Sequence, residues 1–118
     1  IANTDFAAAS PEVVTGFLRA VAKGWKDVIA DPEAGAKMVV ARNPAADAAL
    51  EQRRLQLAID ANVVTDYTTE NGLGSIDTGR FGRAIAQLGE TYEFNGTPDA
   101  TLYFTDRYLP DDGSLSLN

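Results

Sequence analysis

Apolar residues recur at three- and four-residue steps over two long segments of the chain. In the first segment the apolar stripe consists of Val14, Phe17, Leu18, Val21, Trp25 and Val28. In the second, which follows Asp77, it consists of Phe81, Ala84, Ile85, Leu88 and Tyr92. This spacing places each set on one face of an α-helix. The pattern therefore predicts amphipathic helices over about residues 11–30 and 77–88.

Four of the five prolines follow a residue type that caps helices well. The pairs are Ser10-Pro11, Asp31-Pro32, Asn43-Pro44 and Thr97-Pro98. The cap side chain accepts a hydrogen bond from a free backbone N–H, and proline at the first helical position loses nothing because it has no N–H. Together with the periodicity, these pairs predict helices over about residues 11–30, 32–41, 44–61 and 98–104, in addition to the helix capped by Asp77.

The remaining segments carry turn residues and little strand pattern. Residues 62–76 are expected to be a connector, and the only strand candidates are residues 63–64, residues 91–94 and the chain start. The sequence predicts a mainly α protein with four to five helices. We expect a single helical unit over residues 1–110, followed by a flexible tail over residues 111–118.

Composition narrows the function classes. The 118 residues include no His and no Cys, and 17 acidic against 10 basic residues give a formal charge of −7. The length suits one domain. The missing residue types exclude a Ser-His or Cys nucleophile, an ordinary zinc site and a disulfide scaffold. The negative charge argues against nucleic acid and against anionic membrane surfaces as partners.

Two glycine motifs could carry chemistry, but each has a plainer structural explanation. Residues 72–74 (Gly-Leu-Gly) begin like a dinucleotide-binding fingerprint, yet Asp77 stands where the third glycine belongs. A turn before a capped helix is therefore favoured. Residues 95–97 (Asn-Gly-Thr) match a glycosylation acceptor, and a turn that supplies the cap Thr97 is the preferred interpretation.

Other candidates are also expected to be structural. Trp25 could stack on a planar ligand, but its place on the apolar stripe favours the core. Arg53-Arg54 could hold an anion and Asp111-Asp112 a cation, yet exposed pairs of this kind usually face solvent. An aromatic group could line a pocket, although packing between the last helices is favoured; its members are Tyr92, Phe94, Tyr103, Phe104 and Tyr108.

The order of segments resembles a known family. Residues 6–26 read FAAASPEVVTGFLRAVAKGWK, and residues 27–36 continue with DVIADPEAGA. This stretch resembles the C-terminal part of bacterial solute-binding proteins of the thiamine-pyrimidine-precursor (hydroxymethylpyrimidine) synthesis-type family and its alkanesulfonate, nitrate and taurine relatives. Later pieces resemble the same family's tail, namely residues 65–67, 72–74, 76–77, 80–81 and 103–110 (YFTDRYLP).

The resemblance implies a fold and a place within it. The resemblance implies that the whole protein has two α/β lobes, which close on a small molecule as in type II periplasmic binding proteins. This chain would be the C-terminal portion of one lobe, whose helices cover a sheet built from other sequence. Most ligand-contacting residues of the family would then lie outside this chain. Asn3 and Thr4, beside the implied crossover, are the candidate ligand-binding residues, and a plain loop is the alternative.

The function implied by the resemblance is solute capture. We expect the substrate-binding component of an ABC importer, periplasmic or anchored outside the cytoplasmic membrane as a lipoprotein. It would bind a small polar or heteroaromatic solute and a membrane permease, without enzymatic activity, catalytic residues, metal or cofactor. The alternatives are a pyrimidine-precursor synthesis enzyme of the same fold family and a stand-alone helical interaction module. The long apolar stripe of residues 14–28 also suggests a homodimer of this chain.

Overall fold

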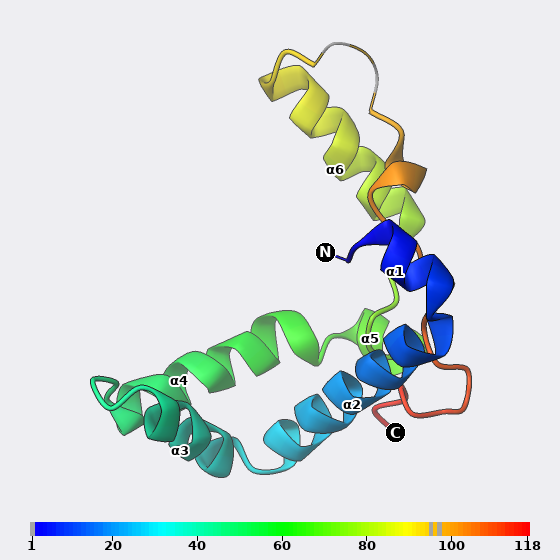
Figure 1. Cartoon of the computed structure of the whole chain (residues 1–118). Helices are drawn as coiled ribbons and strands as arrows, with labels where there is room; N and C mark the ends of the chain where they lie inside the picture. Colours follow the sequence, from blue (N-terminus) through cyan, green and yellow to red (C-terminus); the bar gives the residue numbers. More distant parts are fainter. Residues whose placement is uncertain (1, 95, 97) are drawn as a thin grey trace.

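The computed structural model describes residues 2–94, 96 and 98–118. Figure 1 shows a chain of helices and connecting loops, with no strand in the part of the chain so described. The mainly α prediction is confirmed. The elements are α1 (Thr4–Ala9), α2 (Pro11–Ala30), α3 (Pro32–Arg42), α4 (Ala48–Ala58), the π-helix η1 (Ile59–Val63), α5 (Asp66–Asn71), α6 (Thr78–Thr91) and the 3-10 helix η2 (Ala100–Leu102).

The predicted starts of three helices are confirmed. Helices α2 and α3 begin at the expected prolines, and α6 begins directly after Asp77. The Asp31 carboxylate accepts a hydrogen bond from Ala34 N at 3.0 Å, and the Asp77 carboxylate accepts one from Arg80 N at 2.9 Å. Ser10 stands before α2 without a side-chain cap bond, so proline rather than the serine hydroxyl marks that start.

The helix predicted over residues 44–61 differs at both ends. It begins at Ala48 because the Asp47 carboxylate, not Asn43, caps it by accepting a hydrogen bond from Leu50 N at 2.8 Å. Its α-helical part ends at Ala58, and the chain continues as one π-helical turn. Asn43-Pro44 therefore opens a turn, in which Ala46 N donates to Asn43 O.

Two short helices lie where the sequence predicted no helix. Helix α1 is capped by Asn3, and α5 lies inside the expected connector. Each has six residues, too few to show an apolar period, so local capping rather than a stripe identifies them. Of the helix predicted over residues 98–104, only the 3-10 helix η2 is present. Asp99 caps it, with its carboxylate accepting a hydrogen bond from Thr101 N at 2.9 Å. Thr97, its predicted cap, lies outside the described residues.

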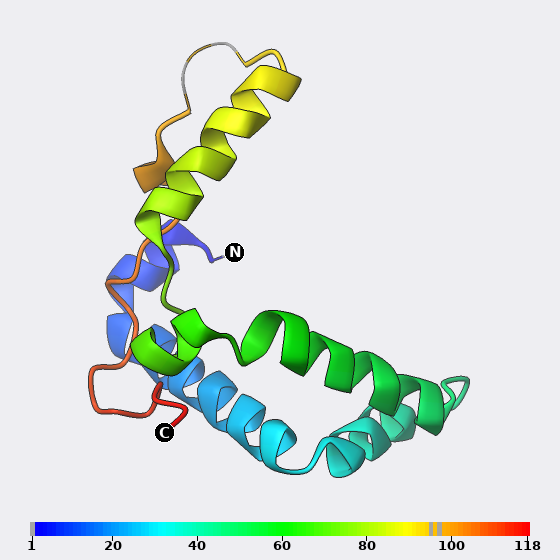
Figure 2. The ribbon, with the colours of Figure 1, turned by 180° about the vertical axis from the view of Figure 1, so that it is seen from behind.

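The helices form an open framework. Helix α3 continues outward from the end of α2 after a bend, and α4 runs back along it toward α5. Helix α6 projects from the other elements as an arm, as Figures 1 and 2 show from opposite sides. The radius of gyration is 17.1 Å, against about 13.5 Å for a compact domain of this length. The accessible surface is 8764 Å², against about 6,200 Å² for a compact protein of this mass.

The core is correspondingly small. The buried apolar side chains are Ala7, Ala22, Ala36, Ile59 and Leu73. The stripe of α2 is only partly covered: Trp25 is half-buried, and Phe17 is 67% exposed. The expectation of Trp25 in a closed core is thus met only in part, because this open framework places few elements over α2.

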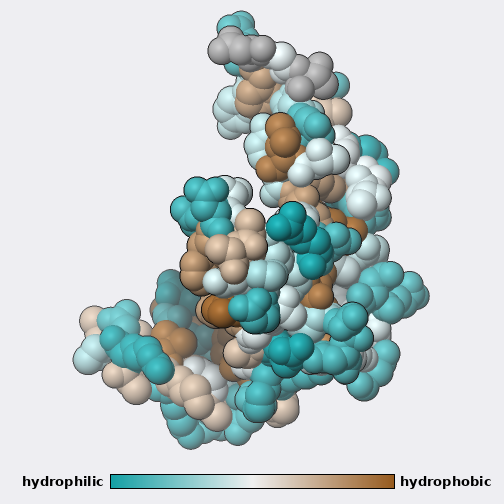
Figure 3. Space-filling model, turned by 45° about the vertical axis from the view of Figure 1, so that its right-hand side comes forward, coloured by the Kyte–Doolittle hydropathy of each residue, from teal (hydrophilic) through white to brown (hydrophobic). Residues whose placement is uncertain are grey.

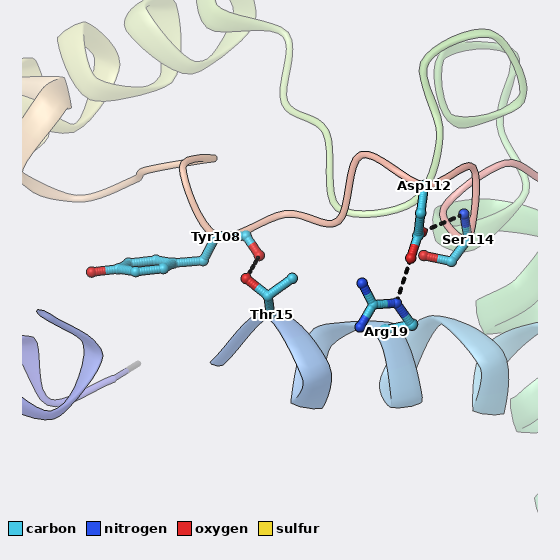
Figure 4. Close-up of polar contacts among 5 residues, drawn as sticks. All are labelled: Thr15, Arg19, Tyr108, Asp112 and Ser114. Atoms are coloured by element: carbon cyan, nitrogen blue, oxygen red, sulfur yellow. Dashed lines mark hydrogen bonds and ion pairs between the residues drawn. The ribbon is translucent and has the colours of Figure 1, made fainter. Parts of the chain in front are cut away.

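The C-terminal segment runs back to α2 and to the loop before α6. The Thr15 hydroxyl donates to Tyr108 O at 2.9 Å, and Arg19 Nε donates to the Asp112 carboxylate at 2.6 Å (Figure 4). Farther along, Leu73 N donates to Leu115 O at 2.9 Å. The segment predicted as a flexible tail therefore contacts two distant parts of the chain.

The Asp112 carboxylate is held in its charged form. Hydrogen bonding from Ser114 lowers the pKa of Asp112 to about 2, and the Arg19 guanidinium contributes further. The backbone bond is clear, with Ser114 N at 3.0 Å from Asp112 Oδ1. Ser114 Oγ is buried and makes no hydrogen bond within the described part of the chain. The backbone N–H of Ser114 and the Arg19 guanidinium therefore account for most of the lowering of the Asp112 pKa.

Close packing at Gly35 gives a first prediction. A Cβ at Gly35 would lie 3.0 Å from Leu55 and 3.2 Å from Val28, where α2, α3 and α4 meet. Gly35→Val should lower the free energy of unfolding by about 1–3 kcal/mol through overpacking. Gly24→Ala, in open space on α2, is the matched control and should raise it by up to about 1 kcal/mol. Urea denaturation measures both, and equal effects of the two substitutions would contradict this packing.

The lowered pKa of Asp112 predicts a pH dependence. Because the folded-state pKa of about 2 lies below the ordinary aspartate value of 3.8, the contribution of Asp112 to stability is fully present above pH 3.8 and is lost as the pH falls toward 2. Asp112→Asn should lower the melting temperature at neutral pH and flatten its decline over that acidic range.

Thermal melts of Asp112→Asn and of Asp111→Asn, read by circular dichroism, test this pH dependence. Asp111 is an exposed neighbour that makes no side-chain hydrogen bond within the described part of the chain. Identical pH profiles for the two variants would refute the role of Asp112.

Candidate functional site

Local hydrogen bonding shapes the turn between α4 and α5. The π-helical turn η1 closes through Val64 N, which donates to Ile59 O at 2.8 Å. A capping box then starts α5: Thr68 N donates to Thr65 Oγ1 at 3.1 Å, and Thr65 N donates to Thr68 Oγ1 at 2.9 Å. These reciprocal bonds fix the direction of α5 relative to η1. Isolated π-helical turns often mark functional sites.

The loop from α5 to α6 depends on two glycines. Gly72 and Gly74 have φ values of 84° and 83°, which residues with a side chain rarely adopt. Between them the buried Leu73 is hydrogen-bonded to the C-terminal segment, and Ser75 Oγ donates to Gly72 O at 2.6 Å. The interpretation of residues 72–77 as a turn before a capped helix is confirmed.

A groove opens where η1, α5 and the first turns of α6 meet. We call it the α5–α6 groove; its volume is about 410 Å³, and it is lined by Ala61, Asn62, Thr65, Tyr67, Thr68, Ser75, Ile76, Asp77, Arg80, Phe81 and Ala84. This volume falls within the range of small-molecule sites. The groove is open to solvent rather than enclosed.

The α5–α6 groove combines apolar and polar walls. Phe81 and Ile76 supply half-buried apolar surface, and Tyr67 adds a second aromatic ring with a hydroxyl. Asn62 and Arg80 bring exposed side-chain donors. Such a wall can pack against a planar molecule and donate hydrogen bonds to its acceptors.

A second groove runs along α6. It has a volume of about 380 Å³ and is lined by Gly82, Ile85, Ala86, Gly89, Phe94, Gly96, Pro98 and Ala100. Its walls carry no ionisable side chain and only small or apolar residues. Because a solute site needs a few directed polar groups, the α5–α6 groove is the better candidate.

The two residues predicted from the resemblance lie elsewhere. Asn3 caps α1, with its side-chain oxygen accepting a hydrogen bond from Phe6 N at 2.8 Å, and Thr4 is the first residue of that helix. Both are exposed, and neither lines a groove. The structure thus gives Asn3 a helix-capping role, and ligand binding by Asn3 and Thr4 stays a prediction.

One member of each charged candidate pair has a structural partner. Arg54 pairs with Glu51 at 2.7 Å, and Asp112 pairs with Arg19. No group of three or more acidic, His or Cys side chains is placed to hold a metal within residues 2–94, 96 and 98–118. Asn95 and Thr97 lie outside the described residues, so the glycosylation motif stays untested.

The aromatic candidates separate into pairs instead of forming one cluster. Phe104 packs edge-on against Phe81 with ring centroids 6.3 Å apart, and Tyr92 lies beside Phe94 at 6.2 Å. Tyr108 lies under the Arg107 guanidinium, 4.5 Å from its ring centroid. Phe104 thus packs the segment after α6 against that helix, whereas Tyr92, Phe94 and Tyr103 are largely exposed.

The analysis of individual sequence motifs did not identify the side chains of the α5–α6 groove as candidate binding residues. Asn62, Tyr67 and Arg80 are ordinary residue types in segments that the sequence marks as a connector and a helix. One indication was nevertheless present: residues 65–67, 76–77 and 80–81 were short pieces of the family resemblance, and all three pieces line the groove. Only the folded chain brings them together.

Comparison with known proteins gives one partial match. The model of the family described as NMT1/THI5 like matches residues 1–35, which span α1, α2 and the start of α3. This match supports the family resemblance at the N-terminal end of the chain. No curated protein and no solved structure matches the chain. Within the described residues, every helix is too short or too polar to cross a membrane.

Proposed function

We propose that this chain is part of a solute-binding protein similar to the NMT1/THI5-like family, and that it binds a small polar or heteroaromatic solute without changing it chemically. The observation that carries the proposal is the family match over residues 1–35. The resemblance of several later segments, in the same order along the chain, extends that support beyond the matched residues.

The α5–α6 groove supplies this chain's share of the solute contacts in the proposal. Tyr67 and Phe81 pack against the plane of the solute, while Arg80 and Asn62 donate hydrogen bonds to its acceptor atoms. These side chains line one groove of a size suited to a small molecule. Arginine suits a carboxylate, sulfonate or ring-nitrogen acceptor because its donors are fixed in a plane.

The open shape of the groove limits the affinity of the chain by itself. In two-lobed binding proteins the solute is enclosed on both sides, and one wall alone removes only part of its surface from water. A Kd of about 1 mM, equivalent to about 4 kcal/mol, is therefore expected for this chain. In the complete assembly the chain would act with an ABC-importer permease outside the cytoplasmic membrane.

An enzyme of pyrimidine-precursor synthesis is the second candidate, because the resemblance to this family also implies that activity class. The sequence of this chain has neither His nor Cys. Those residue types supply most general bases, nucleophiles and metal ligands in enzymes. Any such chemistry would have to use Tyr, Lys or carboxylate groups, so reversible binding is the stronger proposal.

The groove predicts weak and localised solute binding. Titration of the isotope-labelled chain with hydroxymethylpyrimidine, an alkanesulfonate or nitrate to about 10 mM should move amide resonances at the α5–α6 groove for at least one solute. Calorimetry at micromolar concentrations should show no heat, because a Kd near 1 mM leaves the complex almost unpopulated.

Two groove variants and one control make the titration specific. Arg80→Gln and Tyr67→Ala should each weaken binding about 5- to 10-fold, as expected for loss of a charged hydrogen bond or an aromatic contact of about 1–1.5 kcal/mol. Arg53→Gln, an exposed arginine outside the groove, should leave the titration unchanged. Absence of shifts at 10 mM, or conversion of the solute during the experiment, would overturn the proposal.

A further inference from the structure

The two walls of the α5–α6 groove belong to parts of the chain that touch each other little. Tyr67 and Thr68 on α5 line one side, and Arg80 and Phe81 on α6 line the other. Helix α6 packs mainly on η2, and no extensive contact joins α5 to α6 within the described residues. Figure 3 shows the arm of α6 rising from the rest of the molecule, with hydrophobic residues at its surface. The separation of the two walls therefore depends on the loop that joins the two helices.

The last residues of the chain hold this loop from outside the groove. We call residues 108–118 the C-terminal strap; they contain no helix and line neither groove. Leu73 N donates a hydrogen bond to Leu115 O at 2.9 Å, and Asn118 Nδ2 donates one to Thr69 O at 3.3 Å. The strap is thus bonded both to the last turns of α5 and to the loop that follows.

The C-terminal strap also lies against the two glycines of the loop. A Cβ at Gly72 would be 3.2 Å from Leu115 O, and a Cβ at Gly74 would be 3.0 Å from Leu109 Cδ2. Both glycines have positive φ values, and a glycine that is not held populates many other conformations because it has no side chain. Contact with the strap removes that freedom. The docked strap therefore fixes the backbone on both sides of the buried Leu73.

The first half of the C-terminal strap is attached to α2. The Thr15 hydroxyl donates to Tyr108 O, and Arg19 pairs with Asp112, as Figure 4 shows. The residues of α2 line neither groove. The strap is therefore a physical link between two side chains of α2 and the loop that sets the separation of the groove walls.

The C-terminal strap can leave α2 while the helices stay folded. The side chains of Arg19 and Asp112 are 46% and 42% exposed, so water and salt screen the attraction between them. A segment without a helix, held at the surface by hydrogen bonds and an ion pair, opens more easily than the helices that it joins. Once the strap is released, Gly72 and Gly74 regain other conformations, and the two groove walls lose their fixed separation.

We propose that docking of the C-terminal strap on α2 holds the two walls of the α5–α6 groove in one arrangement, which is the arrangement that binds solute, with Leu115 as the positioning residue. This inference rests on the proposed binding of solute in that groove. If only chains with a docked strap have the right wall separation, the apparent affinity falls in proportion to the docked fraction. Linkage requires the reverse effect as well: a bound solute favours the docked strap by the same factor. Occupation of the groove is thereby transmitted to the surface of α2.

Hydrogen exchange at one amide tests the docking of the strap without any solute. The double variant Thr15→Val/Arg19→Gln removes both side-chain contacts that attach the strap to α2. The Leu73 amide reports the strap directly, because its hydrogen bond goes to Leu115 O. Its exchange, followed by NMR, should be about 10-fold faster in the double variant than in the wild-type chain. Lys23→Gln removes another ion pair of α2, and it should leave this exchange unchanged.

Two spin labels test whether the strap fixes the groove walls. The chain has no cysteine of its own, so Glu70→Cys on α5 and Glu90→Cys on α6 can be labelled together. Both positions are exposed and line neither groove. Electron spin resonance should give one narrow distribution of label distances with the strap contacts intact. The same labels in the Thr15→Val/Arg19→Gln background should give a broad distribution.

Solute titration then separates positioning from a general loss of stability. The solutes are hydroxymethylpyrimidine, an alkanesulfonate and nitrate. The double variant should bind at least about 3-fold more weakly than the wild-type chain, and bound solute should slow Leu73 exchange in the wild-type chain. Gly35→Val loosens packing between α2, α3 and α4, outside the strap and the groove, and it should keep the wild-type affinity.

The outcomes distinguish this inference from the proposed function. Unchanged Leu73 exchange and unchanged label distances in the double variant would overturn the role of the strap, whether or not a solute binds. A released strap with undiminished solute affinity would overturn it as well. If no chain binds a solute while the label distances broaden, the proposed function fails and the positioning of the walls by the strap is supported. If the double variant loses helicity, Thr15→Val and Arg19→Gln are compared singly, and each should speed Leu73 exchange.

Discussion

The return of the C-terminal segment to α2 is the constraint on which the rest of the structure depends. Most packing in this chain joins neighbouring elements, as between α3 and α4. The bonds from Thr15 to Tyr108 and from Arg19 to Asp112 instead join positions 93 residues apart. With the backbone bond from Leu73 to Leu115, they fix the loop that leads into α6. The positions of α6 and of both grooves follow from this connection.

The fold leaves unusually little apolar surface buried. Its largest buried side chains are those of Ile59 and Leu73, and the remaining buried apolar residues are alanines. Since hydrophobic burial scales with area at about 25 cal/mol per Å², a framework this open gains less from its own core than a compact domain gains. Additional contacts, such as the solute proposed for the α5–α6 groove, would add to that limited burial.

The two ends of the chain contribute different support for the proposed function. The family match covers α1 and α2, where neither groove lies. The groove is built from later residues, whose resemblance to the same family was visible only as short pieces. Their meeting in one groove links the family resemblance to the candidate site.

The sequence alone determined the helices whose ends and faces are encoded locally. Pro11, Pro32 and Asp77 mark the starts of α2, α3 and α6, because capping and the geometry of proline act within one turn. The tertiary structure decided what these helices meet. The exposed fraction of Phe17, the pairing of Asp112 with Arg19 and the meeting of Tyr67 with Arg80 all depend on elements distant in the chain. No local sequence pattern fixes such contacts, because they form only when separate elements are brought together in the folded chain.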